Sequence, residues 1–195
     1  MIDRLRLIIK ASKQTSIVYL YADYRDWNNQ TLVHILGCFL HQLLTGAGLL
    51  HIPDEVIEAL REVKKQNTKV ELEGVLAMLK LLLEQLDHTF ICIDALDELE
   101  PQARRKLLGI LSNKLQLGAK ATRLFFTARP YIRSEVQSYF DIQQEEEVEI
   151  IAHDNDIRQY LSHKIAEDRR VDPDAMNEVL EAEILAALVA QSQGM

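Results

Sequence analysis

Runs of β-branched and aromatic residues alternate along the chain with longer segments in which apolar residues recur at helical spacing. The runs that this pattern predicts as strands are residues 17–21, 90–93, 123–127 and 148–151. The predicted helices are residues 1–12, a segment of about fifteen residues capped by Asn29 or Thr31, then 54–65, 69–86 and 101–118, and two C-terminal helices from residue 157 and over 174–191.

The order of these elements is strand and helix in alternation, followed by helices alone. Alternation of this kind is typical of a parallel sheet with helices packed on its faces. The apolar run 90–93 is short and nearly continuous, which predicts a strand that is buried on both faces. We therefore predict an α/β fold of three layers with a C-terminal helical appendage.

Composition narrows the class of protein. A hydrophobic content of 48% is enough for a packed core, and a net charge of −8 argues against a surface for nucleic acid or anionic membranes. The basic run Arg104, Arg105 and Lys106 is predicted on the exposed side of its helix, with no other basic cluster to support it.

Cys38 and Cys92 lie in apolar stretches without paired spacing, as expected for reduced cysteines. With no signal-peptide core and no run of membrane-spanning length, we predict a cytoplasmic protein.

Acidic residues follow the predicted strand at 90–93 directly. Asp94 ends the apolar run, and Asp97 and Glu98 come shortly after it. Because ligands of an open parallel sheet bind beyond the carboxyl ends of its strands, these carboxylates stand where a ligand would bind. One carboxylate there can hold Mg²⁺, and another can orient an attacking water or accept its proton. The alternative is a buried strand that ends in a solvated turn.

A basic residue follows the next predicted strand, at 123–127. Arg129 precedes Pro130, which stops the strand from continuing. Both strands end at the same edge of a parallel sheet. We therefore expect the guanidinium to face the same crevice as Asp94 and Glu98 and to donate to phosphate oxygens. The alternative is an arginine that forms an ordinary surface ion pair.

Two weaker features remain open. His34, Cys38 and His41 lie along one side of a predicted helix and could contribute to a zinc site, but structural zinc usually takes four ligands and no fourth is near in sequence. Gly46 and Gly48 form a Gly-x-Gly pair without a following Lys-Ser/Thr, which indicates a helix end and a turn more than a phosphate loop.

The acidic and basic segments together resemble the NACHT domains of NLR-like STAND P-loop NTPases. Residues 90–98, Phe-Ile-Cys-Ile-Asp-Ala-Leu-Asp-Glu, are similar to the Walker B segment of those domains, and residues 127–130, Thr-Ala-Arg-Pro, to their sensor 1. The loop at residues 21–26 resembles that of fungal, nephrocystin-type members. Residues 156–160 and 192–195 resemble the helical segment that follows their last strand.

The resemblance implies a site and its cofactors. In a complete parent protein, Asp94 would bind Mg²⁺, Asp97 and Glu98 would position water for catalysis, and Arg129 would sense the γ-phosphate of ATP or GTP. The nucleotide state would then switch the assembly of a signalling protein.

One departure from the family limits this implication. The chain contains no Gly-x-x-x-x-Gly-Lys-Ser/Thr sequence, the Walker A loop that holds the phosphates in P-loop NTPases. We therefore expect a NACHT core cut at both ends, with a sheet that lacks its first strand. Residues 1–152 would be the partial nucleotide-binding core and residues 153–195 the start of the following helical domain.

The expected function follows from that departure. We expect a chain that is inactive alone, binds no nucleotide tightly, and associates with itself or with other NACHT chains. The alternatives are a nucleotide-independent interaction or decoy module that acts on full-length relatives, and a fragment with no function of its own.

Overall fold

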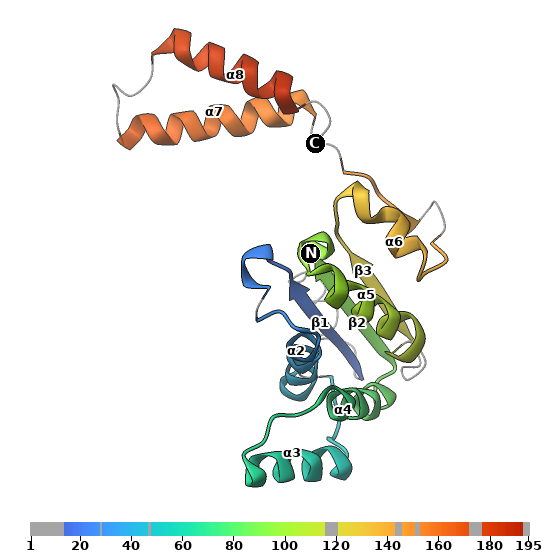
Figure 1. The fold of residues 1–195 in the computed structure, drawn as a ribbon. Helices are drawn as coiled ribbons and strands as arrows, with labels where there is room; N and C mark the ends of the chain where they lie inside the picture. The colour runs from blue at the N-terminus through green and yellow to red at the C-terminus, as the bar shows by residue number, and fades with distance from the viewer. Residues whose placement is uncertain are drawn as a thin grey trace. The chain divides into compact units, whose positions relative to one another are not determined.

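The first three predicted strands form one parallel sheet in the order β1-β2-β3 (Figure 1). A computed structural model describes residues 14–27, 29–46, 48–115, 121–142, 146–150, 153–171 and 177–192. The strands are β1 (Thr15–Tyr21), β2 (His88–Asp94) and β3 (Thr122–Phe126). The predicted α/β fold class is therefore confirmed.

Strand β2 lies between the other two and is buried on both faces, as predicted. Ile91, Cys92 and Ile93 are adjacent along the strand, so they point alternately to opposite faces, and all three are buried. Burial on both faces explains why this strand has no polar alternation in the sequence.

Helices connect the strands and follow the last of them. They are α2 (Leu32–Thr45), α3 (Asp54–Gln66) and α4 (Leu72–Glu84) between β1 and β2, α5 (Pro101–Ile110) with the π-helical turn η3 (Leu111–Leu115) between β2 and β3, and η4 (Pro130–Ile132) with α6 (Arg133–Gln137) after β3. The connection from β1 to β2 and the connection from β2 to β3 cross the sheet in the same direction. Because parallel strands are joined almost always by right-handed crossovers, both connections place their helices on the same face of the sheet. Contacts of α2 with β1, α4 and α5 agree with this arrangement.

Local signals set several helix ends. Thr31 caps α2 by accepting a hydrogen bond from the His34 N–H, and Pro101 is the first residue of α5, both as predicted. Gly46 follows α2, and Gly48 lies against the start of β1. A Cβ atom at Gly48 would be 2.4 Å from the carbonyl oxygen of Thr15, so this position requires a residue without a side chain.

The strand predicted at 148–151 is wrong over the residues that the structure describes there, 148–150. Val148 and Ile150 are 80% and 88% exposed. A strand is stable only when a neighbour satisfies its backbone groups, and the sheet of the described residues provides none at this segment. Residue 151 lies outside the described residues, as do the predicted helix at 1–12 and the predicted helix end at Gly118.

The chain divides into two compact units, residues 1–141 and 142–195. The second unit contains α7 (Asp154–Val171) and α8 (Glu178–Ser192), which contact each other, and Arg169 and Glu181 form an ion pair of 2.6 Å between them. The predicted C-terminal helices are thus confirmed. The functional boundary predicted at residues 152 and 153 stays a prediction. In the described part of the chain, no helix has the length and apolar character needed to cross a membrane.

Candidate functional site

The predicted site residues lie where the three strands end. Asp94, the last residue of β2, pairs with Tyr21 at the end of β1. Beyond β3, the Thr127 N–H donates to the Ile93 carbonyl at 3.0 Å, which keeps the segment that leads to Arg129 beside β2. The acidic and basic segments therefore share the carboxyl edge of the sheet, as the sequence predicts.

Asp94 is exposed and is held in place by the neighbouring strand end. Its Oδ1 atom accepts a hydrogen bond of 2.5 Å from the Thr127 hydroxyl, whose oxygen also accepts from the Ala95 N–H at 2.8 Å. Ala95 has a φ of 54°, in the left-handed region, so the chain turns sharply away from β2 immediately after Asp94. A small residue suits such a turn.

Asp97 is the most deeply buried of these acids, with a side chain only 4% exposed. It lies in the short 3-10 helix η2 (Leu96–Glu98). Its Oδ1 accepts from the Arg129 N–H at 3.2 Å, and its Oδ2 accepts from the Tyr131 hydroxyl at 3.3 Å. The carboxylate therefore already serves as an anchor for the segment after β3.

Arg129 is brought to Asp97, and its side chain is 73% exposed. The Nε atom lies 3.6 Å from Asp97 Oδ2, and most of the side chain remains accessible to solvent. The predicted proximity of Arg129 to the acidic segment is therefore observed, with Asp97 as the residue that it contacts.

Glu98 is half-buried and contacts the loop after β1. Its Oε2 accepts from the Tyr24 N–H at 3.4 Å, and its carbonyl accepts from the indole N–H of Trp27 at 2.5 Å. In the same loop, hydrogen bonds from Arg25 lower the pKa of Asp23 to about 2, so Asp23 stays ionised and caps η1 (Tyr24–Asp26). This loop thus covers one side of Glu98.

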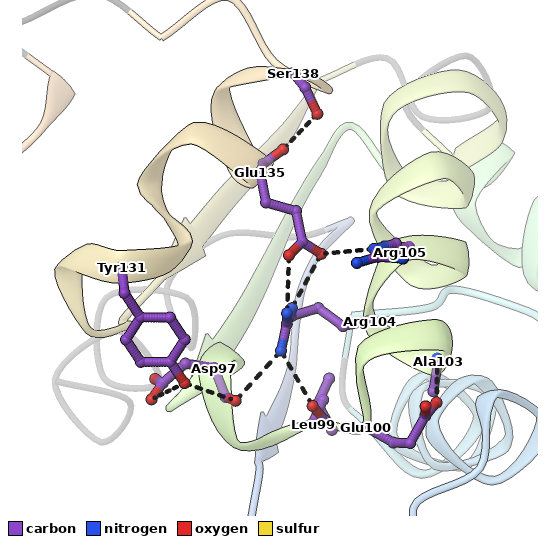
Figure 2. Close-up of polar contacts among 9 residues, drawn as sticks. All are labelled: Asp97, Leu99, Glu100, Ala103, Arg104, Arg105, Tyr131, Glu135 and Ser138. Carbon is purple, nitrogen blue, oxygen red and sulfur yellow. Dashed lines mark hydrogen bonds and ion pairs between the residues drawn. The ribbon is translucent and has the colours of Figure 1, made fainter.

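Sequence reasoning placed Arg104 wrongly. It was predicted on the exposed side of its helix, but it is only 6% exposed. Its Nη1 donates to the carbonyls of Asp97 and Leu99 at 3.3 and 3.2 Å. Its Nε and Nη2 donate to the Glu135 carboxylate at 3.1 and 2.8 Å (Figure 2).

A signal for this burial was present in the sequence. Leu107, Leu108 and Leu111 lie three, four and seven residues after Arg104, so all four share one face of the helix. Arg105, one position later, falls off that face and is exposed. Helical phase therefore outweighs the basic character of the triplet, whereas nothing local identifies Glu135 as the partner.

The ion pair between Arg104 and Glu135 is expected to make the protein less stable as the pH becomes acidic. Hydrogen bonds from Arg104 hold the pKa of Glu135 below its usual range. A carboxylate with a lowered folded-state pKa contributes stability above its unfolded pKa and loses it as the pH falls through the folded value. From about pH 6 to about pH 3, we expect the wild type to lose more unfolding free energy than Glu135→Gln does. Urea titrations across this range measure the difference, and parallel curves would contradict the assignment.

A protein metal cluster is not found among the described residues. They contain no group of three or more His, Cys, Asp or Glu side chains that could hold a metal ion. Mg²⁺ is often bound by one or two carboxylates together with waters and substrate phosphates. Asp94, which is exposed at the strand end, has the donor chemistry for such a site.

Much of the chain is similar to a known protein family. Residues 1–129 match the family model described as Nephrocystin 3, N-terminal. The matched region contains β1, β2 and β3 and ends at Arg129. No curated protein matches the chain.

Proposed function

The chain belongs to the Nephrocystin 3, N-terminal family, and from this premise we propose that it is part of the nucleotide-binding core of a NACHT-type signalling NTPase. The complete protein would bind ATP or GTP with Mg²⁺ and use the nucleotide state to switch its assembly. One observation carries the proposal: Asp94, Glu98 and Arg129 all lie at the carboxyl edge of one parallel sheet, where ligands of this class of fold bind.

The contacts favour different roles for the three acids. Asp94 is exposed and would contribute a carboxylate to Mg²⁺, which neutralises phosphate charge when it is bound. Glu98 is half-buried and would orient the attacking water. Asp97 is already committed to Arg129 and Tyr131, so it would position Arg129 rather than act on water.

Nucleotide binding also needs a loop that cradles the phosphates. The 195 residues contain no Gly-x-x-x-x-Gly-Lys-Ser/Thr sequence. Asp94 and Arg129 alone would supply a few charge-assisted hydrogen bonds, largely offset by the entropy lost on association. We therefore propose that these residues act with a Walker A loop outside this sequence, in a longer chain or in a partner.

Replacement of Glu98 tests the proposed chemistry. In a protein that carries the Walker A segment of a family member ahead of Met1, we expect Glu98→Gln to slow hydrolysis by about 10²–10⁴-fold. The nucleotide dissociation constant should change little, because glutamine keeps the shape and removes only the basic oxygen. Single-turnover hydrolysis and calorimetry with Mg-ATP measure the two quantities.

Glu100→Gln is the matched control. Glu100 lies in the same acidic segment, but its carboxylate caps α5 by accepting from the Ala103 N–H at 2.7 Å, which glutamine can also do. It should leave hydrolysis unchanged. If Glu98→Gln abolished binding and spared turnover, the role assigned to Glu98 would be wrong.

A second candidate is a nucleotide-independent module that binds full-length relatives. It is favoured by the missing Walker A sequence and by the outer edge of β3, which has no neighbouring strand in the described part of the chain. Both candidates predict weak binding to the 195-residue chain alone, so calorimetry of the protein that carries the added Walker A segment separates them. Under this second proposal Mg-ATP binds with a dissociation constant of about 1 mM or weaker, and micromolar affinity would exclude it.

A further inference from the structure

Arg104 joins α5 to the segment around η2, which directly precedes it in the sequence, and to α6, where its partner lies 31 residues later. It extends from α5, donates to two carbonyls around η2, and forms a two-bond ion pair with Glu135 in α6 (Figure 2). Both carbonyls belong to the acidic segment, at Asp97 and Leu99. One side chain therefore connects the acidic segment with the helix that follows Arg129.

A second set of bonds connects the same two segments. The Asp97 carboxylate accepts from the Arg129 N–H and from the Tyr131 hydroxyl, while the Asp97 carbonyl accepts from Arg104. Arg129 and Tyr131 precede α6, and only Ile132 lies between Tyr131 and the first residue of that helix. The two segments are therefore connected at two places, by Asp97 to Arg129 and by Arg104 to Glu135.

We propose that Arg104 and Glu135 are positioning residues, which hold the acidic segment and the Arg129–Tyr131 segment together as one unit. The placement of Arg129 against Asp97, and hence its distance from Glu98, depends on this ion pair. Its importance for nucleotide sensing rests on the proposed function, whereas the coupling itself is a property of the chain without nucleotide.

The chemistry of arginine explains why this residue fits the position. A guanidinium carries five donors in a planar fork, and four hydrogen bonds are made here in two directions. A lysine ammonium is a single point charge on a flexible stem and cannot reproduce that geometry. Arg105 lies 3.8 Å from the same carboxylate, but its side chain is 61% exposed and forms no hydrogen bond or ion pair with η2 among the described residues.

Two local probes report on the coupling. The Arg129 amide donates directly to Asp97 Oδ1, so its hydrogen exchange measures how often that contact opens. Trp27, the only tryptophan of the chain, donates to the Glu98 carbonyl, so its emission reports on the acidic segment. Neither residue contacts Arg104 or Glu135 in the described hydrogen bonds and ion pairs, so local loss of packing at the ion pair alone would leave both probes unchanged.

The experiment compares variants of the 195-residue chain well below their unfolding temperatures. We expect Arg104→Lys and Glu135→Gln each to speed exchange at the Arg129 amide by about tenfold or more, and to shift or quench the Trp27 emission. Arg105→Lys is the matched control and should change neither. Leu43→Ala lowers global stability from the buried face of α2, and it should not change the ratio of Arg129 exchange to exchange in β2.

The opposite result would overturn the inference: equal Arg129 exchange and equal Trp27 emission in Arg104→Lys, Glu135→Gln and Arg105→Lys. The inference would also be overturned if Leu43→Ala increased the ratio of Arg129 exchange to β2 exchange as much as Arg104→Lys does. The effect would then come from global destabilisation. No nucleotide takes part in either measurement. A failure of the complete protein to bind nucleotide would therefore count against the proposed function and not against this coupling.

Discussion

Arg104→Ala is expected to lower the free energy of unfolding by about 3–5 kcal/mol. The replacement removes four hydrogen bonds and leaves the Glu135 carboxylate without its main partner in a largely buried position. It also leaves the carbonyls of Asp97 and Leu99 without this donor. Since a typical domain is stable by only about 5–15 kcal/mol, the loss would be a large part of the total. Urea denaturation followed by circular dichroism measures it.

Two further variants test whether the lost stability comes from the unpaired charge of Glu135 or only from the removal of a positive charge. Arg105→Ala removes an exposed neighbour 3.8 Å from Glu135 and should cost within about 1 kcal/mol. Arg104→Met combined with Glu135→Leu removes both charges together, and should be less destabilising than Arg104→Ala because no unpaired buried charge remains. A cost of Arg104→Ala no greater than that of Arg105→Ala would contradict the structural assignment.

The sheet could be predicted because its strands differ from helices in local pattern. Residues 90–93 are four apolar residues in succession, too few for a core helix, and they form the centre of β2 with both faces buried. The acids that follow mark the end of the strand, so the place of Asp94 at the sheet edge follows from the same pattern. Arg129 could be placed for the same reason, because it follows the end of β3 at Phe126 closely.

Contacts between distant segments could not be predicted in this way. The role of Asp97 as an anchor depends on Arg129 and Tyr131, more than thirty residues later. Glu135 pairs with Arg104 across a similar separation, and nothing in the sequence near Glu135 distinguishes it from an ordinary surface charge. The helical stripe shared with Leu107 and Leu108 shows that Arg104 is buried, but only the fold shows what it binds.

The strand predicted at 148–151 failed for a related reason. Val148 and Ile150 have strong strand propensity, but a strand also needs a neighbour at the right place. In the described part of the chain, the sheet ends at β3 and offers these residues no pairing. Strand propensity alone therefore does not make these residues a strand when no neighbouring strand pairs with them in the described part of the chain.

The outer edge of β3 has a consequence for association. The Thr127 N–H donates to Ile93, and the Ala121 carbonyl accepts from Thr89, so odd-numbered residues of this strand direct their backbone groups to β2. Alternation then directs the N–H and C=O groups of Thr122, Leu124 and Phe126 away from β2. Such an edge can pair with a strand of another molecule, and each new hydrogen bond contributes about 0.5–1.5 kcal/mol net.

We therefore expect the purified chain to self-associate through β3 as its concentration rises, and Phe125→Lys to shift it toward the monomer. Phe125 is 43% exposed on this edge strand, and a lysine there opposes pairing because its charge would have to be desolvated. Leu50→Lys is the matched control: it also replaces an exposed apolar residue, but in the connection between α2 and α3. Size-exclusion chromatography with light scattering over a concentration series measures the mass. A wild-type chain that stays monomeric and unfolds sharply above about 60 °C would show that this edge needs no partner strand.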